Sequence, residues 1–165
     1  MQASSRQTSS SKTKKTTKKS FKKSLIEKHK LSKGDLLKMY ANIITSRKLD
    51  DAEITMKKQS KAYFQISGAG HEGILTACSM VLKPKYDFFI PYYRDRALCL
   101  GLGVTPYEML CQANGNIGDK ASHGRQMPAH WGHVDYNIIN KSSCTGTQFF
   151  RLELFVMKLF GVETS

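Results

Sequence analysis

A sharp change in composition at Leu31 limits what this chain can fold into. After Met1, Phe21 is the only large apolar residue in the first 24 positions, and residues 1–30 hold ten Lys and Arg against one acid. Their net charge of +9 is most of the +13 of the whole chain. A segment with so little to bury cannot offset the conformational entropy lost on ordering. We therefore expect residues 1–30 to form a disordered basic tail.

Charge alone gives the basic tail no specific partner. A polybasic segment can contact nucleic acid, an anionic membrane or an acidic protein, but a solvated extension needs none of them and is the simpler interpretation. We therefore expect no nucleic-acid partner. The tail lacks the apolar core of a secretory peptide, while its Ser richness and scarcity of acids resemble an organellar transit peptide with Lys in place of Arg.

The rest of the composition indicates a reducing compartment and no membrane span. No stretch approaches the roughly 20 apolar residues of a transmembrane helix. The cysteines form no CxxC pair and show no regular spacing, which argues against zinc and against a disulfide framework. They are Cys78, Cys99, Cys111 and Cys144. We expect the bacterial cytoplasm, or the mitochondrial matrix if the tail is a transit peptide.

A long helix is predicted directly after the tail. In residues 31–58, Ser32 and Asp35 are capping candidates, and the apolar residues that follow recur three and four positions apart. These are Leu36, Leu37, Tyr40, Ile43 and Ile44. The spacing predicts a helix that packs on one side only, through this apolar stripe.

Further helices alternate with short extended segments. We expect an extended segment at 63–70, a helix over 71–82 that stops before Pro84, a strand at 88–90 that ends at Pro91, and a helix from Arg94. The apolar stripe of the 71–82 helix comprises Ile74, Leu75, Cys78, Val81 and Leu82. Thr105 and Pro106 open another helix. Residues 116–140 predict a long ordered loop, and the whole pattern predicts an α/β layer fold.

Three polar groups could carry chemistry. Tyr93 and Arg94 follow the 88–90 strand, where a guanidinium and a phenol can clamp an anion. Taken alone, these residues fit an ordinary surface Arg–Asp pair better. The loop also holds His123, Arg125, His130 and His133, whose spacing fits packing and hydrogen bonding better than metal binding. Small polar residues at 142–148 could present oxygens or amides to an ion.

Four motifs together resemble a known family. "GAGHEGI", "PYYRDRALCLGLG", "GRQMPAHWG" and "SSCTGTQF" occur in the order and at the spacing of the alpha subunit of thiamine-diphosphate-dependent 2-oxo acid dehydrogenases. The branched-chain (2-oxoisovalerate) type is the most similar and the pyruvate type the next. The resemblance covers residues 31–148 and implies the amino-terminal part of a thiamine-diphosphate-binding fold, an incomplete parallel sheet flanked by helices. In this family, thiamine diphosphate decarboxylates the 2-oxo acid and the acyl group passes to a lipoyl arm.

The resemblance also implies site residues and partners. Tyr93 and Arg94 match residues that reach the cofactor's diphosphate, and Ser143 and Thr145 match the segment beside its aminopyrimidine. A structural potassium ion is implied at a second set of residues: Ser142, Cys144, Thr147 and Gln148. His130 and Arg125 match a loop near the active-site mouth, and no catalytic residue is assigned. The implied partners are a beta subunit or beta half, a lipoylated acyltransferase and the 2-oxo acid substrate.

The sequence departs from the family pattern after Gln148. The magnesium-diphosphate motif, Gly-Asp-Gly followed by Asn-Asn, is absent, and the glutamate that activates the cofactor belongs to the beta part. Residues 149–165 form a divergent, bulky apolar terminus where the family has small residues. We therefore expect a truncated alpha part that is inactive alone. The alternatives are a binding fragment that pairs with beta or full alpha chains, and a non-functional remnant.

Overall fold

The computed structural model describes residues 26–161, and their packing divides between Lys38 and Met39 into two units. In the first unit, residues 26–28 are helical and a turn precedes helix α2 (Lys33–Lys58). Ser32 Oγ accepts the Asp35 N–H at 3.0 Å, and Asp35 Oδ2 accepts the Ser32 N–H at 3.0 Å, which confirms the predicted cap. Residues 1–25 of the predicted disordered tail lie outside the described residues, whereas its residues 26–30 form a helical turn and a further turn.

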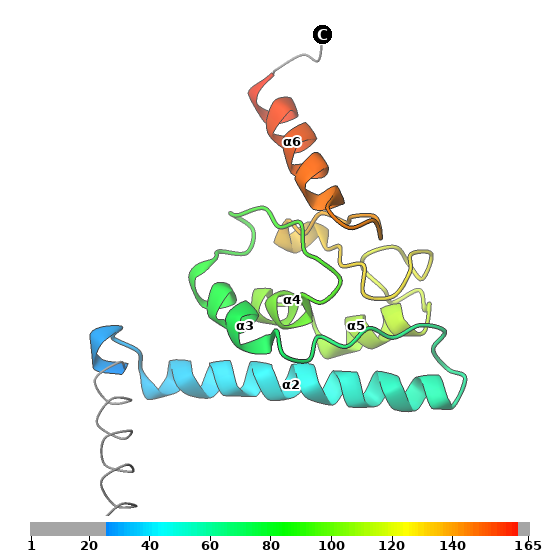
Figure 1. Cartoon of the computed structure of the whole chain (residues 1–165), viewed down its shortest axis with the longest axis horizontal. Coiled ribbons are helices and arrows are strands. Elements are labelled where there is room, and N and C mark those ends of the chain that lie inside the picture. Colours follow the sequence, from blue (N-terminus) through cyan, green and yellow to red (C-terminus); the bar gives the residue numbers. More distant parts are fainter. Residues whose placement is uncertain (1–25, 162–165) are drawn as a thin grey trace, which may run out of the picture. The chain divides into compact units, whose positions relative to one another are not determined.

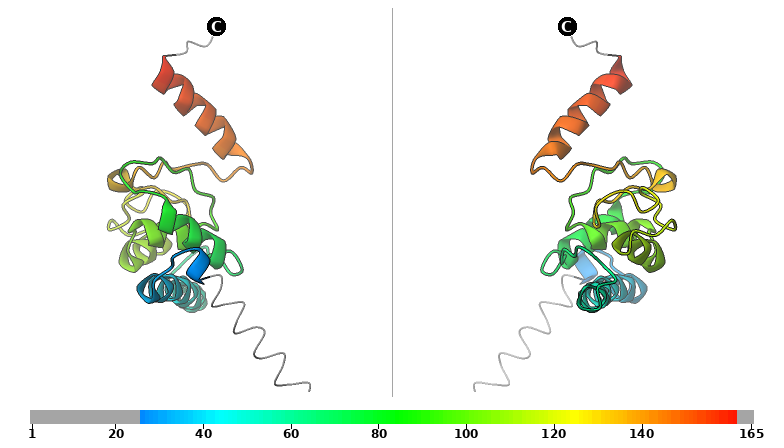
Figure 2. Two further views of the ribbon diagram at one scale, coloured as in Figure 1. Left: turned by 90° about the vertical axis from the view of Figure 1, so that its left-hand side faces the viewer. Right: turned by 90° about the vertical axis from the view of Figure 1, so that its right-hand side faces the viewer.

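In the second unit, helix α2 lies beside helices α3 (Glu72–Val81) and α4 (Arg96–Leu102), as Figures 1 and 2 show. Asn42 Nδ2 joins all three helices, since it donates to Thr76 Oγ1 and to the Ala97 carbonyl, both at 2.8 Å. Helices α3 and α4 also pack against each other. Helices α3 and α4 thus pack together against one side of α2.

The predicted apolar stripes of α2 and α3 turn inward only in part. Leu82 packs against the core, and the other half-buried stripe residues are Leu36, Ile43, Leu75 and Cys78. In α2 the buried residues are Ser46, Leu49, Asp50 and Glu53. Tyr40 and Ile44 of the predicted stripe are 64% and 39% exposed, and in α3 Ile74 and Val81 are 67% and 75% exposed. Glu72 and Thr76 are the buried residues of α3. Polar partners on neighbouring elements, described below, determine which sides face inward.

Helix α5 (Pro106–Ala113) begins as the sequence predicts. Thr105 Oγ1 accepts the Glu108 N–H at 3.2 Å, and Glu108 Oε2 accepts the Thr105 N–H at 2.8 Å. Gly103 follows the last residue of α4 and has a φ of 120°, a conformation that favours glycine. A Cβ at this position would lie 2.8 Å from Cζ of the Tyr136 ring, so there is no room for a side chain. Tyr136 belongs to the 3₁₀ helix η1 (Val134–Tyr136).

One apolar core joins these helices to the long loop. Its members come from α2, the extended segment before α4, helices α4 and α5, and the loop: Leu49, Phe89, Cys99, Leu102, Val104, Met109, Ala129, Trp131 and Ile138. Ala129 and Trp131 are both 5% exposed, so the predicted ordered loop at 116–140 is confirmed.

The predicted parallel sheet is absent from residues 26–161. Phe89 pairs with Ile138 in an isolated parallel bridge, and Ile138 pairs with His133 in an isolated antiparallel one. Two backbone hydrogen bonds of ordinary length hold Phe89: its N–H donates to the Asn137 carbonyl at 3.0 Å, and its carbonyl accepts the Ile139 N–H at 2.8 Å. Pairing stops there because Pro91 has no N–H to donate.

Helix α6 (Thr147–Phe160) follows the loop and has no buried residue. Its Phe155 ring lies 4.7 Å from the Phe88 ring, centroid to centroid. The predicted domain boundary between 148 and 149 falls inside this continuous helix. Over the described part of the chain, no helix has the length and apolar character needed to cross a membrane.

Candidate functional site

A pocket of about 290 Å³ lies where four separate stretches of the second unit meet. Its polar lining residues are Tyr93, Arg94, His130 and Ser143, and its apolar ones are Phe64, Ile66 and Met127. The chain places Tyr93 and Arg94 here because the extended segment ends at Pro91 and turns before α4. Two residues predicted for the diphosphate and one predicted for the aminopyrimidine thus share one pocket.

Ser143 and His130 form the closest polar contact in this pocket. Ser143 Oγ lies 2.7 Å from His130 Nε2, and His130 Nδ1 lies 3.0 Å from the Pro128 carbonyl. A carbonyl only accepts, so Nδ1 must carry the proton in the neutral ring and Nε2 must accept from the Ser143 hydroxyl. Met127 Sδ is a second neighbour of the hydroxyl at 3.6 Å. His130 is buried, so the pairing fixes its ring.

Arg94 reaches the pocket without a carboxylate partner. Its Nη1 donates to the Ser67 carbonyl at 2.9 Å, and its guanidinium lies 5.5 Å from the Tyr93 ring centroid. Among residues 26–161, no Asp or Glu forms an ion pair with Arg94. A carbonyl orients a guanidinium but leaves its charge uncompensated, which suits a site for an anion.

A second layer of polar contacts lies beside Tyr93. The hydroxyls of Tyr92 and Tyr93 are hydrogen-bonded, which raises the pKa of Tyr92. Lys141 is buried, with Nζ 4.0 Å from the Tyr92 ring centroid, and burial lowers the pKa of its ammonium. Thr145 interacts with the Tyr92 side chain and does not line the pocket. The predicted role of Thr145 therefore has only this indirect link to the pocket.

The residues predicted to hold potassium form a cluster of oxygens before and at the start of α6. Ser142 Oγ donates to Thr147 Oγ1 at 3.0 Å, and Thr147 Oγ1 donates to the Cys144 carbonyl. The side chain of the fourth residue, Gln148, is bound by a lysine: its Oε1 accepts from Lys141 Nζ at 3.4 Å. Three of these oxygens are thus linked to one another by hydrogen bonds, and the Lys141 ammonium engages the fourth.

The other loop residues singled out in the sequence have packing roles or face solvent. His133 is buried, and its Nε2 lies 3.5 Å from Glu108 Oε1. The exposed Arg125 donates from Nε to the Ser122 carbonyl at 3.0 Å, and His123 is exposed. Within the described part of the chain, no three His, Cys, Asp or Glu side chains gather as a metal site would require.

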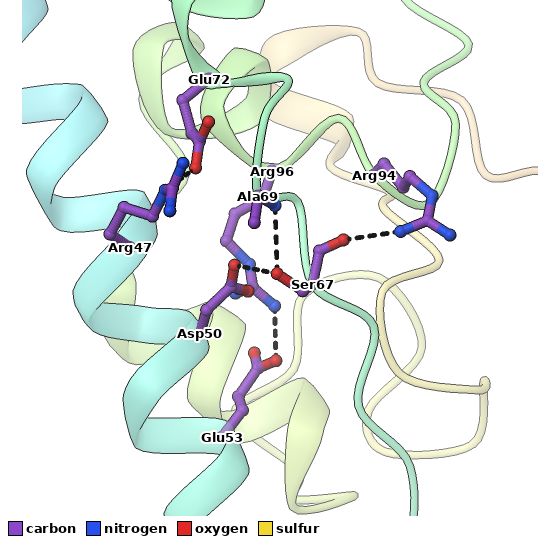
Figure 3. A network of polar contacts seen from close by, with 8 residues as sticks. All are labelled: Arg47, Asp50, Glu53, Ser67, Ala69, Glu72, Arg94 and Arg96. Atoms are coloured by element: carbon purple, nitrogen blue, oxygen red, sulfur yellow. Dashed lines mark hydrogen bonds and ion pairs between the residues drawn. The ribbon is translucent and has the colours of Figure 1, made fainter.

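Sequence reasoning missed a buried ion-pair cluster next to the pocket. Arg96 is 1% exposed and contacts both Asp50 and Glu53 of α2, each 4% exposed (Figure 3). Arg47 of α2 pairs with Glu72 of α3 in the same view. The acids at positions 50 and 53 share one helix side, but spacing alone gives no reason to expect charged residues to be buried.

Comparison with known proteins assigns the chain to a family. The sequence profile of the dehydrogenase E1 component matches residues 40–157, which include every residue lining the pocket. The chain therefore belongs to the dehydrogenase E1 component family.

The similar proteins include several alpha subunits of one enzyme. The chain is 30% identical over 118 residues to the 2-oxoisovalerate dehydrogenase subunit alpha of Bacillus subtilis, covering 72% of this chain and 36% of that protein. It is 31% identical over 112 residues to the mitochondrial subunit alpha 2 of Arabidopsis thaliana, covering 68% and 23%. It is 27% identical over 121 residues to the subunit alpha of Pseudomonas aeruginosa, and this match covers 73% of this chain and 29% of that protein. The chain thus spans only about a quarter to a third of these relatives.

Proposed function

We propose that this chain is the cofactor-binding alpha part of the decarboxylating component of a 2-oxo acid dehydrogenase. Its substrates are 2-oxoisovalerate-like acids, and the acyl product passes to a lipoyl group. The main supporting observation is that Tyr93 and Arg94 line the same pocket as Ser143, which is far from them in sequence. Relatives named 2-oxoisovalerate dehydrogenase subunit alpha support the choice of substrate.

The pocket residues fit one end of thiamine diphosphate. Arg94 supplies an uncompensated positive charge for the diphosphate, and the Tyr93 ring flanks it. Bound thiamine diphosphate supplies the carbon nucleophile that adds to the 2-oxo group and allows carbon dioxide to leave. Phe64, Ile66 and Met127 give the pocket an apolar wall. His130 holds the Ser143 hydroxyl in a fixed direction, and no catalytic step is assigned to either residue.

The size of the pocket supports a partner. Pockets that enclose a whole ligand measure about 300–1,000 Å³, and this one, at about 290 Å³, lies at the lower limit. We propose that a beta subunit or beta half completes the cofactor site, and that a lipoylated acyltransferase takes the product. The chain alone is then inactive. Its sequence contains no Gly-Asp-Gly motif, so we assign no magnesium ligand to residues 1–165.

Three further parts of the proposal concern the ion, the fold and the compartment. The oxygens of Ser142, Cys144, Thr147 and Gln148 bind potassium. The parallel pairing of Phe89 with Ile138 belongs to the parallel sheet of a thiamine-diphosphate-binding fold. The compartment is the bacterial cytoplasm or the mitochondrial matrix, in keeping with bacterial and mitochondrial relatives.

A second candidate function is binding without catalysis. Helix α6 exposes apolar side chains on several sides, among them Phe149 at 71% and Phe160 at 77%. Large exposed apolar surfaces mark interaction sites. The chain would then pair with a beta chain or a full alpha chain and contribute no cofactor site. Residues 149–165 would carry this function.

Calorimetric titration with thiamine diphosphate and magnesium distinguishes the two functions. We expect the chain with a matching beta subunit to bind the cofactor, and Arg94→Gln to weaken binding about tenfold to a hundredfold, the usual cost of a lost charge-assisted hydrogen bond. The matched control is Lys48→Gln, which removes an exposed positive charge from α2. Pairing with the beta subunit without cofactor binding would favour the second function. Equal affinities of Arg94→Gln and the control would contradict the first.

A further inference from the structure

A buried charge cluster anchors the segment that holds Arg94. Arg96 spans two acids of α2, with Nη1 at Asp50 Oδ1 and Nη2 at Glu53 Oε2. All three side chains are nearly inaccessible to solvent. Because both donors come from one planar guanidinium, the two carboxylates are held at fixed positions relative to α4. Asp50 is thus a rigid acceptor.

The second oxygen of Asp50 extends this rigid cluster to the loop before α3. Ser67 Oγ donates to Asp50 Oδ2 at 2.7 Å and accepts the Ala69 N–H at 3.0 Å. The Ser67 hydroxyl therefore links its own loop to helix α2. Figure 3 shows the side chain between Asp50 and Arg94.

The carbonyl of the same residue receives the pocket arginine. Arg94 Nη1 donates to the Ser67 carbonyl at 2.9 Å. Gly68 follows directly, and a Cβ built on it would lie 3.1 Å from the Arg94 carbonyl, so the two backbones approach closely. The position of one peptide group thus sets where the Arg94 guanidinium lies in the pocket.

We propose that Ser67 is a positioning residue: its hydroxyl, held by Asp50, fixes the carbonyl that aims Arg94 at the anionic end of the ligand. This inference rests on the proposed function for the identity of that ligand. The neutral carbonyl orients Arg94 and the buried acids remain with Arg96, so the full charge of Arg94 stays available to a diphosphate. A carboxylate at position 67 would orient Arg94 equally well but cancel its charge.

The test compares a phosphorylated ligand with its unphosphorylated form. Titrations use the chain with a matching beta subunit and magnesium, with thiamine diphosphate and with thiamine. We expect Ser67→Ala to raise the Kd of thiamine diphosphate about threefold to tenfold, as for the loss of one hydrogen bond, and to leave the Kd of thiamine unchanged. Ser67→Thr keeps the hydroxyl and restores the affinity. Ser79→Ala, which removes a hydroxyl bonded to Thr76 within α3, is the matched control.

Two outcomes of the titrations would overturn the positioning role. One is an unchanged Kd of thiamine diphosphate in Ser67→Ala. The other is an equal weakening for both ligands, which would indicate general damage to the fold. If Arg94→Gln leaves the Kd of thiamine diphosphate unchanged, the proposed function fails instead.

A ligand-free measurement keeps the two failures separate. The side-chain ¹⁵N–¹H resonances of Arg94 are identified by their loss in Arg94→Gln. We expect them to shift in Ser67→Ala and to remain in place in Ser79→Ala. Unshifted resonances in Ser67→Ala overturn the positioning role, whether or not the cofactor binds.

Discussion

The Ser143 hydroxyl oxygen lies 2.7 Å from His130 Nε2, across a loop that separates the two residues by thirteen positions. The opposite ring nitrogen faces the Pro128 carbonyl at 3.0 Å. This arrangement defines the direction of the Ser143 O–H bond at the pocket and the tautomer of a buried imidazole. Both properties can be measured directly.

The first prediction concerns that tautomer. When the His130 ring is neutral, we expect ¹⁵N-edited NMR spectra to show its proton on Nδ1, because the Pro128 carbonyl can only accept. Ser143→Ala removes the donor to Nε2 but should leave the tautomer unchanged, since the Pro128 contact remains. A proton found on Nε2 would contradict the hydrogen-bond assignment.

The second prediction concerns the buried ion pairs. Arg96→Met leaves Asp50 and Glu53 without a cation in the interior, so we expect the free energy of unfolding to fall by about 3–5 kcal/mol, the usual cost of breaking a buried pair. Urea denaturation measures this change. Arg125→Met is the matched control, because its exposed side chain should cost less than about 0.5 kcal/mol. Equal losses in the two variants would refute the buried cluster.

The third prediction is a pH dependence from Glu53. Burial raises the pKa of the Glu53 carboxyl above its model-compound value of 4.5, although Arg96 partly opposes the shift. The folded state therefore binds this proton more tightly than the unfolded state, and the contribution of Glu53 to stability falls as pH rises above about 4.5. Glu53→Gln cannot ionise. Relative to this variant, the wild type should lose stability as the pH rises from about 4.5 towards neutrality.

Urea midpoints measured side by side across that pH range test the sign. A wild type that gains stability over Glu53→Gln with rising pH would show that Arg96 stabilises the ionised carboxylate more than burial disfavours it. The Arg96 contact would then dominate the titration of Glu53.

The fourth prediction concerns the proposed potassium site. The Lys141 ammonium lies 3.4 Å from Gln148 Oε1, so a bound monovalent cation meets a like charge nearby. Lys141→Met removes this charge. We expect its thermal unfolding midpoint to rise more in KCl than in NaCl at equal ionic strength, and by more than in the wild type. Lys61→Met, at an exposed position, should behave as the wild type does. A larger potassium response in the wild type would contradict the expected repulsion.

The sequence predicts local features of this fold well. The caps at Ser32 and Thr105 are confirmed because a cap is decided by residues three positions apart. The packing side of α2 is not local in this sense. Asp50 is buried because Arg96, 46 positions later, pairs with it, and hydrophobic spacing within the helix carries no information about that partner.

The same contrast holds for the site. Tyr93 and Arg94 can be singled out because an arginine where a strand ends is a recognisable anion-binding pattern, and both line the pocket. The link from Arg94 to Ser67 spans 27 positions and uses a backbone carbonyl, which no side-chain pattern reveals. Similarly, Lys141 offers no sign of burial in a loop of polar residues.

Helix α6 is fourteen residues long and has no buried residue, so the core contributes almost nothing to keeping it folded. Isolated helices of about 12–15 residues are marginal in water. Its amide hydrogens should therefore exchange early unless another surface covers its apolar side chains. Slowed exchange in this helix would then act as an internal reporter of assembly, readable without any cofactor or substrate.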